Sequence, residues 1–194
     1  MKPHHAIPKR QLEKMFDIAR KHSPKIHALI SLLYVGALRI QDAIGLTFEQ
    51  ITKLKPTRGK VRILKLVEKK TTARDIQITA GVVESVKTYQ QSRGMSDDQV
   101  MFKSGPKGNE TSRWIMSLTR FFQKHNIAVQ SHDFRTTMIT DYYNNCKDLA
   151  KTKKFSGHAS IKMVERYVKV DKEKMHEENA EFLQRQMPGK RARV

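Results

Sequence analysis

Apolar residues recur at steps of three and four through much of the chain, which is the spacing of one helical face. Leu12, Met15, Phe16 and Ala19 show this spacing first, and they predict a helix over residues 9–21. The same spacing predicts further helices over residues 25–36, 39–44, 82–89, 111–122 with Thr111 as its N-cap, 132–145, 147–155 and 160–169.

Between residues 46 and 79 the helical spacing gives way to β-branched and alternating residues. Residues 61–67 and 74–79 predict the two strands of a hairpin, and residues 47–51 are a candidate third strand. The pattern leaves open a hairpin alone or a three-stranded sheet. All the elements together predict a mostly α fold with a small antiparallel β-sheet, in the α+β class.

Basic residues outnumber acidic ones, and they are spread through the body of the chain. Lys and Arg total 38 against 19 for Asp and Glu, which gives a net charge of +19. This is the electrostatic footprint of a nucleic-acid-binding protein, although an RNA-binding surface or a lysine-rich proteome gives the same excess. Ten basic residues are candidate DNA contacts: Lys55, Arg58, Lys60, Arg62, Lys65, Lys69, Arg74, Lys151, Lys153 and Lys154.

Several classes of protein are disfavoured by what the sequence lacks. Cys146 is the only cysteine, so no disulfide forms within one chain and no thiolate cluster holds a metal. No apolar run reaches the length of a membrane span, and no signal peptide is visible. We therefore expect an intracellular, DNA-associated protein without a metal site or a membrane partner. The compartment is left open between a bacterial cytoplasm or nucleoid and a nucleus.

The most specific pattern lies near the end of the chain. His132 and Arg135 are three residues apart on one face of an expected helix. His158 follows Gly157, and Tyr167 stands nine residues after His158. A tyrosine that attacks phosphorus needs such neighbours, because cations hold the phosphate and imidazoles move protons. The simpler interpretation is that Tyr167 packs in the core with its hydroxyl at the rim.

Together with two earlier segments, these residues resemble the catalytic domain of the tyrosine recombinases, the phage-integrase type of site-specific recombinase. The first segment is Gly36–Leu46, where Arg39 and Asp42 match the family's first arginine and the acid that follows it. The second is Lys69-Lys70-Thr71 on the expected hairpin, where the family keeps a catalytic lysine. The resemblance covers about residues 9–170.

The resemblance implies an enzyme that cuts and rejoins DNA through a covalent 3′-phosphotyrosine intermediate on Tyr167. Arg39 and Arg135 are expected to grip the non-bridging oxygens, because guanidinium groups match the geometry of phosphate. His132 is the expected base for the tyrosine, or the group that orients it. His158 is expected to hydrogen-bond the phosphate.

The remaining roles concern the leaving group and the partners. Lys70 is the expected general acid for the departing 5′ oxygen, with Lys69 as its rival, and Asp42 is expected to orient a basic site residue. The resemblance implies double-stranded DNA as partner, four protomers assembled on two duplexes, a monomer without DNA, and no cofactor. A type IB topoisomerase shares this chemistry, and a non-catalytic DNA-binding module shares the basic surface, so both stand as alternatives.

Two positions depart from the family pattern. Ser156 stands where an aliphatic residue commonly precedes Gly-His, and Gly36 lies one residue earlier than expected relative to Arg39, with Ala37 between. The expected division of the chain is an N-terminal leader or linker remnant over 1–8, a catalytic domain over 9–170, a C-terminal helix over 171–187 that is a candidate for exchange between protomers, and a basic tail over 188–194.

Overall fold

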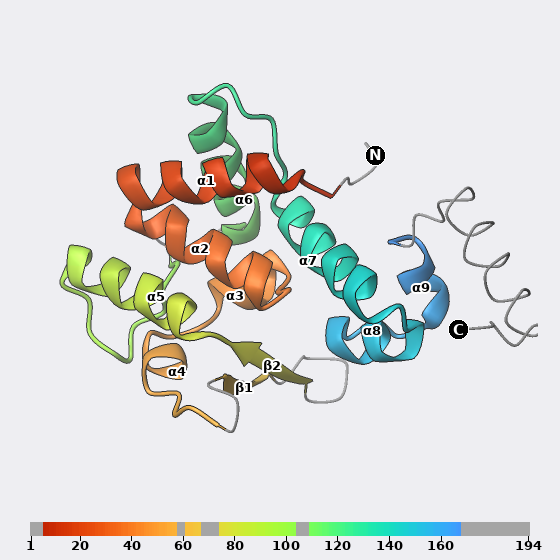
Figure 1. Cartoon of the computed structure of the whole chain (residues 1–194). Coiled ribbons are helices and arrows are strands. Elements are labelled where there is room, and N and C mark those ends of the chain that lie inside the picture. Colours follow the sequence, from red (N-terminus) through yellow and green to blue (C-terminus); the bar gives the residue numbers. More distant parts are fainter. Residues whose placement is uncertain (1–5, 58–60, 67–73, 104–108, 168–194) are drawn as a thin grey trace, which may run out of the picture.

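The protein is seen in a computed structural model that describes residues 6–57, 61–66, 74–103 and 109–167 (Figure 1). Within these residues the chain forms nine helices and one two-stranded antiparallel sheet, which confirms the predicted mostly α fold. No helix in these ranges has the length and apolar character needed to cross a membrane. The elements are α1 (Lys9–His22), α2 (Pro24–Val35), α3 (Ile40–Ile44), α4 (Glu49–Thr52), β1 (Arg62–Leu66), β2 (Arg74–Ile78), α5 (Ala80–Arg93), α6 (Glu110–Gln123), α7 (Ser131–Cys146), α8 (Leu149–Ser156) and α9 (Ile161–Glu165).

Helix α2 is the centre of the fold. Ser23 caps it, because the serine side chain accepts a hydrogen bond from the Ile26 amide at 3.3 Å. Pro24 occupies the first turn, where its missing N–H has no helical partner to lose. The helix packs against α1, α5 and α7, so most of its side chains are apolar, and Leu29 and Leu32 are fully buried.

A chain of aromatic rings fills the space between α4, α5 and α6. Phe48 packs on Tyr89, Tyr89 stacks on Phe102, and Phe102 meets Trp114 edge to face. The Tyr89 hydroxyl donates to the carbonyl of Met101 at 3.0 Å, and the Trp114 indole N–H donates to the carbonyl of Phe102. Each polar ring therefore buries its apolar area while its own donor is satisfied.

The sheet is the predicted hairpin, and one of its faces packs on the core. Strands β1 and β2 pair with Leu64 opposite Ile76. Leu64, Ile76 and Ile78 are buried, whereas Lys65 and Asp75, which pair with each other, are exposed. The alternation fixes the register, because a slip of one residue would turn the apolar side chains to solvent.

Three details differ from the sequence-based prediction. Residues 47–51 form no third strand, since Thr47 makes only an isolated bridge to Val100 and the chain then turns into α4. Thr111 is not the N-cap of α6, because Asn109 precedes the helix and its side chain accepts a backbone N–H at 3.3 Å. Helix α9 ends at Glu165, and Arg166 and Tyr167 form a turn, so the expected helix over 160–169 is shorter than predicted, and residues 168 and 169 lie outside the described residues.

Helix α7 carries the chain from the core to the end of the described region. Its first half contributes Phe134 to the core, α8 packs on α7, and α9 packs on α8. Figure 1 shows α8 and α9 gathered beside the C-terminal part of α7, away from α5. Residues 149–167 are called the C-terminal module below.

Candidate active site

The loop between α2 and α3 carries Arg39. Gly36 ends α2, and Ala37 adopts a left-handed conformation with φ of +46°. Such a conformation costs a residue with a Cβ about 1–2 kcal/mol. Arg39 is the extended N-cap residue of α3, so it precedes the helix that it was expected to begin. Asp42 lies in the first turn of α3, where its amide donates to the Arg39 carbonyl at 3.0 Å.

Arg135 connects this loop to the C-terminal module. The residue lies on α7, and only 1% of its surface is exposed. Its Nη1 donates to the Ala37 carbonyl, and its Nη2 donates to the Ser156 carbonyl at 2.6 Å. The two bonds fix the plane of the guanidinium. Because the group is withdrawn from water, its charge is weakly screened at short range.

The C-terminal module brings His158 and Tyr167 together. Gly157 ends α8 with φ of +69°, a left-handed conformation that suits a residue without Cβ. His158 is buried, its Nδ1 lies 2.6 Å from Ser156 Oγ, and its Nε2 lies 3.5 Å from Tyr167 Oη. The second distance is at the outer limit of a hydrogen bond. The imidazole therefore stands between a serine hydroxyl and the phenol oxygen.

The phenol of Tyr167 responds to both arginines of the site. Burial raises its pKa above the usual range, and the positive charges of Arg135, Arg39 and Arg166 lower it by less, so that the pKa is raised overall. Tyr167 is thus neutral at pH 7 and needs a base in order to attack. The hydrogen bonds of Arg135 to the carbonyls of Ala37 and Ser156, each two residues from Arg39 or His158, bring the loop that carries Arg39 and the half-buried tyrosine to the same region.

His132 lies in the first turn of α7, one turn before Arg135, and its side chain is half-buried. Gln130 and Asp133 form the capping box of this helix. The His158 imidazole contacts the Tyr167 oxygen. Among the described residues, no three His, Cys, Asp or Glu side chains gather into a group that could hold a metal ion.

The candidate DNA contacts are only partly within the described residues. Arg62 donates through Nε to the Leu54 carbonyl at 3.1 Å, and Lys151 forms an ion pair with Asp148 at 3.6 Å. The exposed candidates are Lys55, Lys65, Lys151 and Lys154, and the half-buried ones are Arg62 and Lys153. Outside the described residues lie Arg58, Lys60, Lys69, the expected general acid Lys70, and the side chain of Arg74 on β2.

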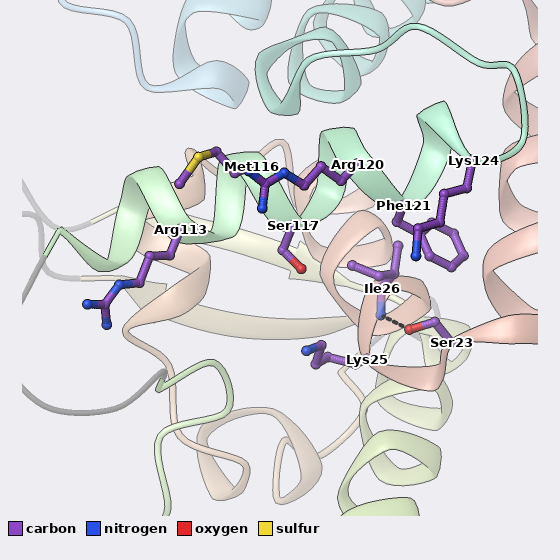
Figure 2. Close-up of a pocket in the computed structure, with 9 residues that line it drawn as sticks. All are labelled: Ser23, Lys25, Ile26, Arg113, Met116, Ser117, Arg120, Phe121 and Lys124. Atoms are coloured by element: carbon purple, nitrogen blue, oxygen red, sulfur yellow. Dashed lines mark hydrogen bonds between the residues drawn. The ribbon is translucent and has the colours of Figure 1, made fainter.

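A further group of cations lines an open groove of about 500 Å³ between α2 and α6 (Figure 2). The Nζ of Lys25 lies 4.8 Å from the centre of the Trp114 ring, a cation–π contact. Burial, and next the charge of Arg93, lower the pKa of this lysine. The basic side chains of the groove are those of Lys25, Arg113, Arg120 and Lys124.

The density of basic residues along the sequence did not reveal this groove, because density singles out consecutive basic stretches such as the hairpin, and the cations of the groove are dispersed. The three basic residues from the α6 side stand at positions 113, 120 and 124, that is, at steps of seven and four. This spacing keeps them on one helical face. The spacing of basic residues on the predicted helix was the signal that could have found the groove.

Comparison with known proteins places the chain in a family. The model of the phage integrase family matches residues 5–174. The tyrosine recombinase XerC of Leptospira interrogans is 24% identical over 155 residues, which are 77% of this chain and 48% of XerC. The chain thus spans about half the length of the curated relatives that it matches.

Solved structures of recombinases share the fold. XerH bound to its difH substrate superimposes with a TM-score of 0.72 at 18% identity, over 92% of this chain and 54% of XerH. The Tn1549 transposon integrase, in complex with transposon right end DNA, superimposes with a TM-score of 0.72 at 18% identity, over 95% of this chain and 67% of the integrase. XerA superimposes with a TM-score of 0.70 at 18% identity, over 96% of this chain and 68% of XerA. Because the family model covers most of its length, this chain belongs to the phage integrase family.

Proposed function

We propose that this chain breaks and rejoins DNA at specific sites through a covalent 3′-phosphotyrosine intermediate on Tyr167. The observation that carries the proposal is the convergence of the Tyr167 hydroxyl, the His158 imidazole and the charges of Arg39 and Arg135 from three separate parts of the chain. The family of the chain supports it, as do a recombinase relative and recombinases solved with DNA.

The two arginines supply the charge that phosphoryl transfer requires. As Tyr167 attacks, negative charge builds on the non-bridging oxygens of the phosphate, and Arg39 and Arg135 are proposed to hold those oxygens. By analogy with an oxyanion-hole donor, each contact is worth about 2.7–4 kcal/mol in the transition state. The bonds from Arg135 to Ala37 and Ser156 orient its guanidinium before DNA arrives.

Proton transfer needs a base for the phenol and an acid for the departing 5′ oxygen. The proposed acid is Lys70, or Lys69 beside it. His132 and His158 are the two imidazoles available for the phenol proton and for a hydrogen bond to the phosphate. Asp42, in the turn that follows Arg39, is proposed to orient a basic side chain of the site.

Affinity for duplex DNA is proposed to come mainly from cations on the surface. Exposed lysines of the hairpin and of α8 contribute, and so do the four cations of the α2–α6 groove. Binding should therefore weaken steeply as salt concentration rises. We further propose a catalytic domain over 9–170, four protomers on two duplexes, a monomer without DNA, and exchange of 171–187 between protomers.

The decisive test is covalent capture. Nicked suicide duplexes, selected for binding from a randomised library, are incubated with the protein, and adducts that survive denaturation are measured. Tyr167→Phe should abolish the adduct while DNA affinity stays within about twofold, and the control Tyr143→Phe should keep it. An adduct on the Tyr167→Phe protein would show that another residue is the nucleophile.

The arginines and the alternative activity are tested with the same substrates. Arg39→Ala and Arg135→Ala should each slow adduct formation by more than about tenfold, as loss of a transition-state contact requires. A smaller loss would contradict their assignment. Relaxation of a supercoiled plasmid that lacks the selected site, with no exchange between paired sites, would favour a topoisomerase over a recombinase.

A further inference from the structure

Three side chains of the C-terminal module stand in a row. Ser156 Oγ lies 2.6 Å from His158 Nδ1, and His158 Nε2, the other ring nitrogen, lies 3.5 Å from Tyr167 Oη. The serine is fully buried and the histidine is nearly so. A buried hydroxyl in such short contact decides which ring nitrogen carries the proton.

The surroundings of Ser156 indicate the direction of its hydrogen bonds. Its Oγ donates to the Lys153 carbonyl at 3.3 Å. A hydroxyl has a single proton, so when Oγ donates it to the Lys153 carbonyl, Oγ meets the imidazole as an acceptor. In that arrangement a neutral His158 carries its proton on Nδ1. A neutral imidazole that is protonated on one nitrogen offers a lone pair on the other, and here that nitrogen faces Tyr167.

We propose that Ser156 holds His158 as the Nδ1–H tautomer, and that His158 Nε2 takes the phenol proton of Tyr167 as the tyrosine attacks phosphorus. The inference rests on the proposed function and assigns to His158 the role of base that the sequence suggested for His132. Ser156 is a positioning residue, and the site of the family pattern that it occupies is commonly aliphatic.

The step balances without any further reactant. The Tyr167 Oη–H bond breaks and its proton passes to Nε2, the Oη–P bond forms, and the P–O5′ bond breaks as the 5′ oxygen takes a proton from the general acid. On rejoining, the imidazolium returns its proton to the leaving phenolate. The need for a base is independent of this geometry, since burial keeps the pKa of Tyr167 raised against the charges of Arg135, Arg39 and Arg166.

The tautomer is measured in the free protein, where it does not depend on DNA cleavage. Long-range ¹H–¹⁵N correlation spectra of the full chain with ¹⁵N-labelled histidine distinguish the two neutral tautomers, and His158→Gln identifies the signals of His158. The expected result is Nδ1–H in the unaltered protein and loss of that preference in Ser156→Ala. Alanine keeps the main-chain carbonyl that Arg135 uses. An Nε2–H form, or no change in Ser156→Ala, would overturn the role of the serine.

The base is identified by chemical rescue of adduct formation. His158→Gln should slow the adduct by about 10²–10⁴-fold, the range for general acid–base catalysis. A fluorinated tyrosine at position 167 ionises more readily. It should therefore raise the rate of adduct formation at least tenfold in His158→Gln and leave that rate unchanged in His132→Gln. Rescue of His132→Gln alone would overturn the proposal. No adduct from the unaltered protein would instead refute the proposed function, while the tautomer measurement would still decide the Ser156–His158 contact.

Discussion

The helical body and the C-terminal module of this domain are held together in different ways. In the body, one hydrophobic cluster extends from Ile7 to Phe134 and joins helices α1 to α7 with the hairpin. The module buries little apolar surface of its own among the residues described. Its buried side chains are Thr152, Ser156, His158 and Val164.

The module is held instead by directional contacts. Arg135 binds the Ser156 carbonyl, and the Tyr142 ring of α7 stacks on Phe155 of α8 with centroids 4.1 Å apart. Directional contacts fix geometry well, but they bury less area than a core does. The proposed nucleophile therefore lies on the part of the molecule that should open most easily.

The largest expected effect comes from the core of the body. Phe122→Ala removes a fully buried ring of α6 and should lower the free energy of unfolding by about 3–5 kcal/mol. Phe121→Ala, its half-buried neighbour, is the matched control and should cost distinctly less. Urea unfolding measures both. Equal losses would mean that the hydrophobic cluster does not dominate the stability of the body.

The next effect should be confined to the module. Arg135→Ala leaves the carbonyls of Ala37 and Ser156 without this donor, and hydrogen bonds to charged groups contribute about 1.5–3 kcal/mol each. Relief of the buried charge offsets part of this, so we expect a loss of about 2–4 kcal/mol. Amide hydrogen exchange should accelerate in α8 and α9 and stay nearly unchanged in α2. Uniform acceleration of exchange would show that the body and the module open together. The control is Lys154→Ala, at an exposed position of α8.

Substitutions at the neighbouring residues Gly36 and Ala37, at the end of α2, should have smaller and opposite effects on stability. A Cβ added at Gly36 would lie 2.8 Å from the Leu32 carbonyl oxygen, so Gly36→Ala should destabilise by about 1–3 kcal/mol. Ala37→Gly should stabilise by about 0.5–1 kcal/mol, because glycine adopts the left-handed conformation without strain but is more flexible when unfolded. Thermal and urea unfolding test the pair. Destabilisation by Ala37→Gly would contradict the assigned strain.

The smallest effect is a pH dependence within the body. The Tyr34 hydroxyl of α2 donates to Asp141 of α7 at 3.0 Å, and burial, followed by the charge and hydrogen bond of Asp141, raises the pKa of Tyr34 to about 12. The folded state thus favours the neutral phenol. Its contribution is fully present below pH about 10 and is lost between about 10 and 12. Tyr34→Phe should flatten the fall in stability over this interval, and an unchanged slope would mean that the pair contributes nothing.

The sequence predicted the helices well where apolar spacing was the only signal, as in α2, expected over 25–36 and found over Pro24–Val35. It failed where one pattern fits two structures. Phe48 and Ile51 are both fully buried and lie three apart, which suits a helical turn as well as a loose strand. The choice between them depends on the partner, and the amides of Phe48 and Glu49 bond to the carbonyls of the 97–99 loop.

The candidate site was predictable as a set of residues but not as an arrangement. Spacing singled out His158 and Tyr167, yet the contact between them depends on the left-handed turn at Gly157. Arg135 is buried and binds the carbonyl of Ala37, which is 98 residues away in the sequence. No local sequence pattern predicts such a contact. The sequence showed Ser156 only as a departure from the family pattern, whereas in the structure its hydroxyl contacts the His158 imidazole.

The two carbonyls bound by Arg135 are made at very different times during translation. Ser156 is synthesised more than a hundred residues after Ala37. A partly synthesised or truncated chain that lacks α8 also lacks the Ser156 carbonyl, so one of the two hydrogen bonds that orient the Arg135 guanidinium cannot form. The orientation of Arg135 therefore depends on synthesis that has continued through Ser156.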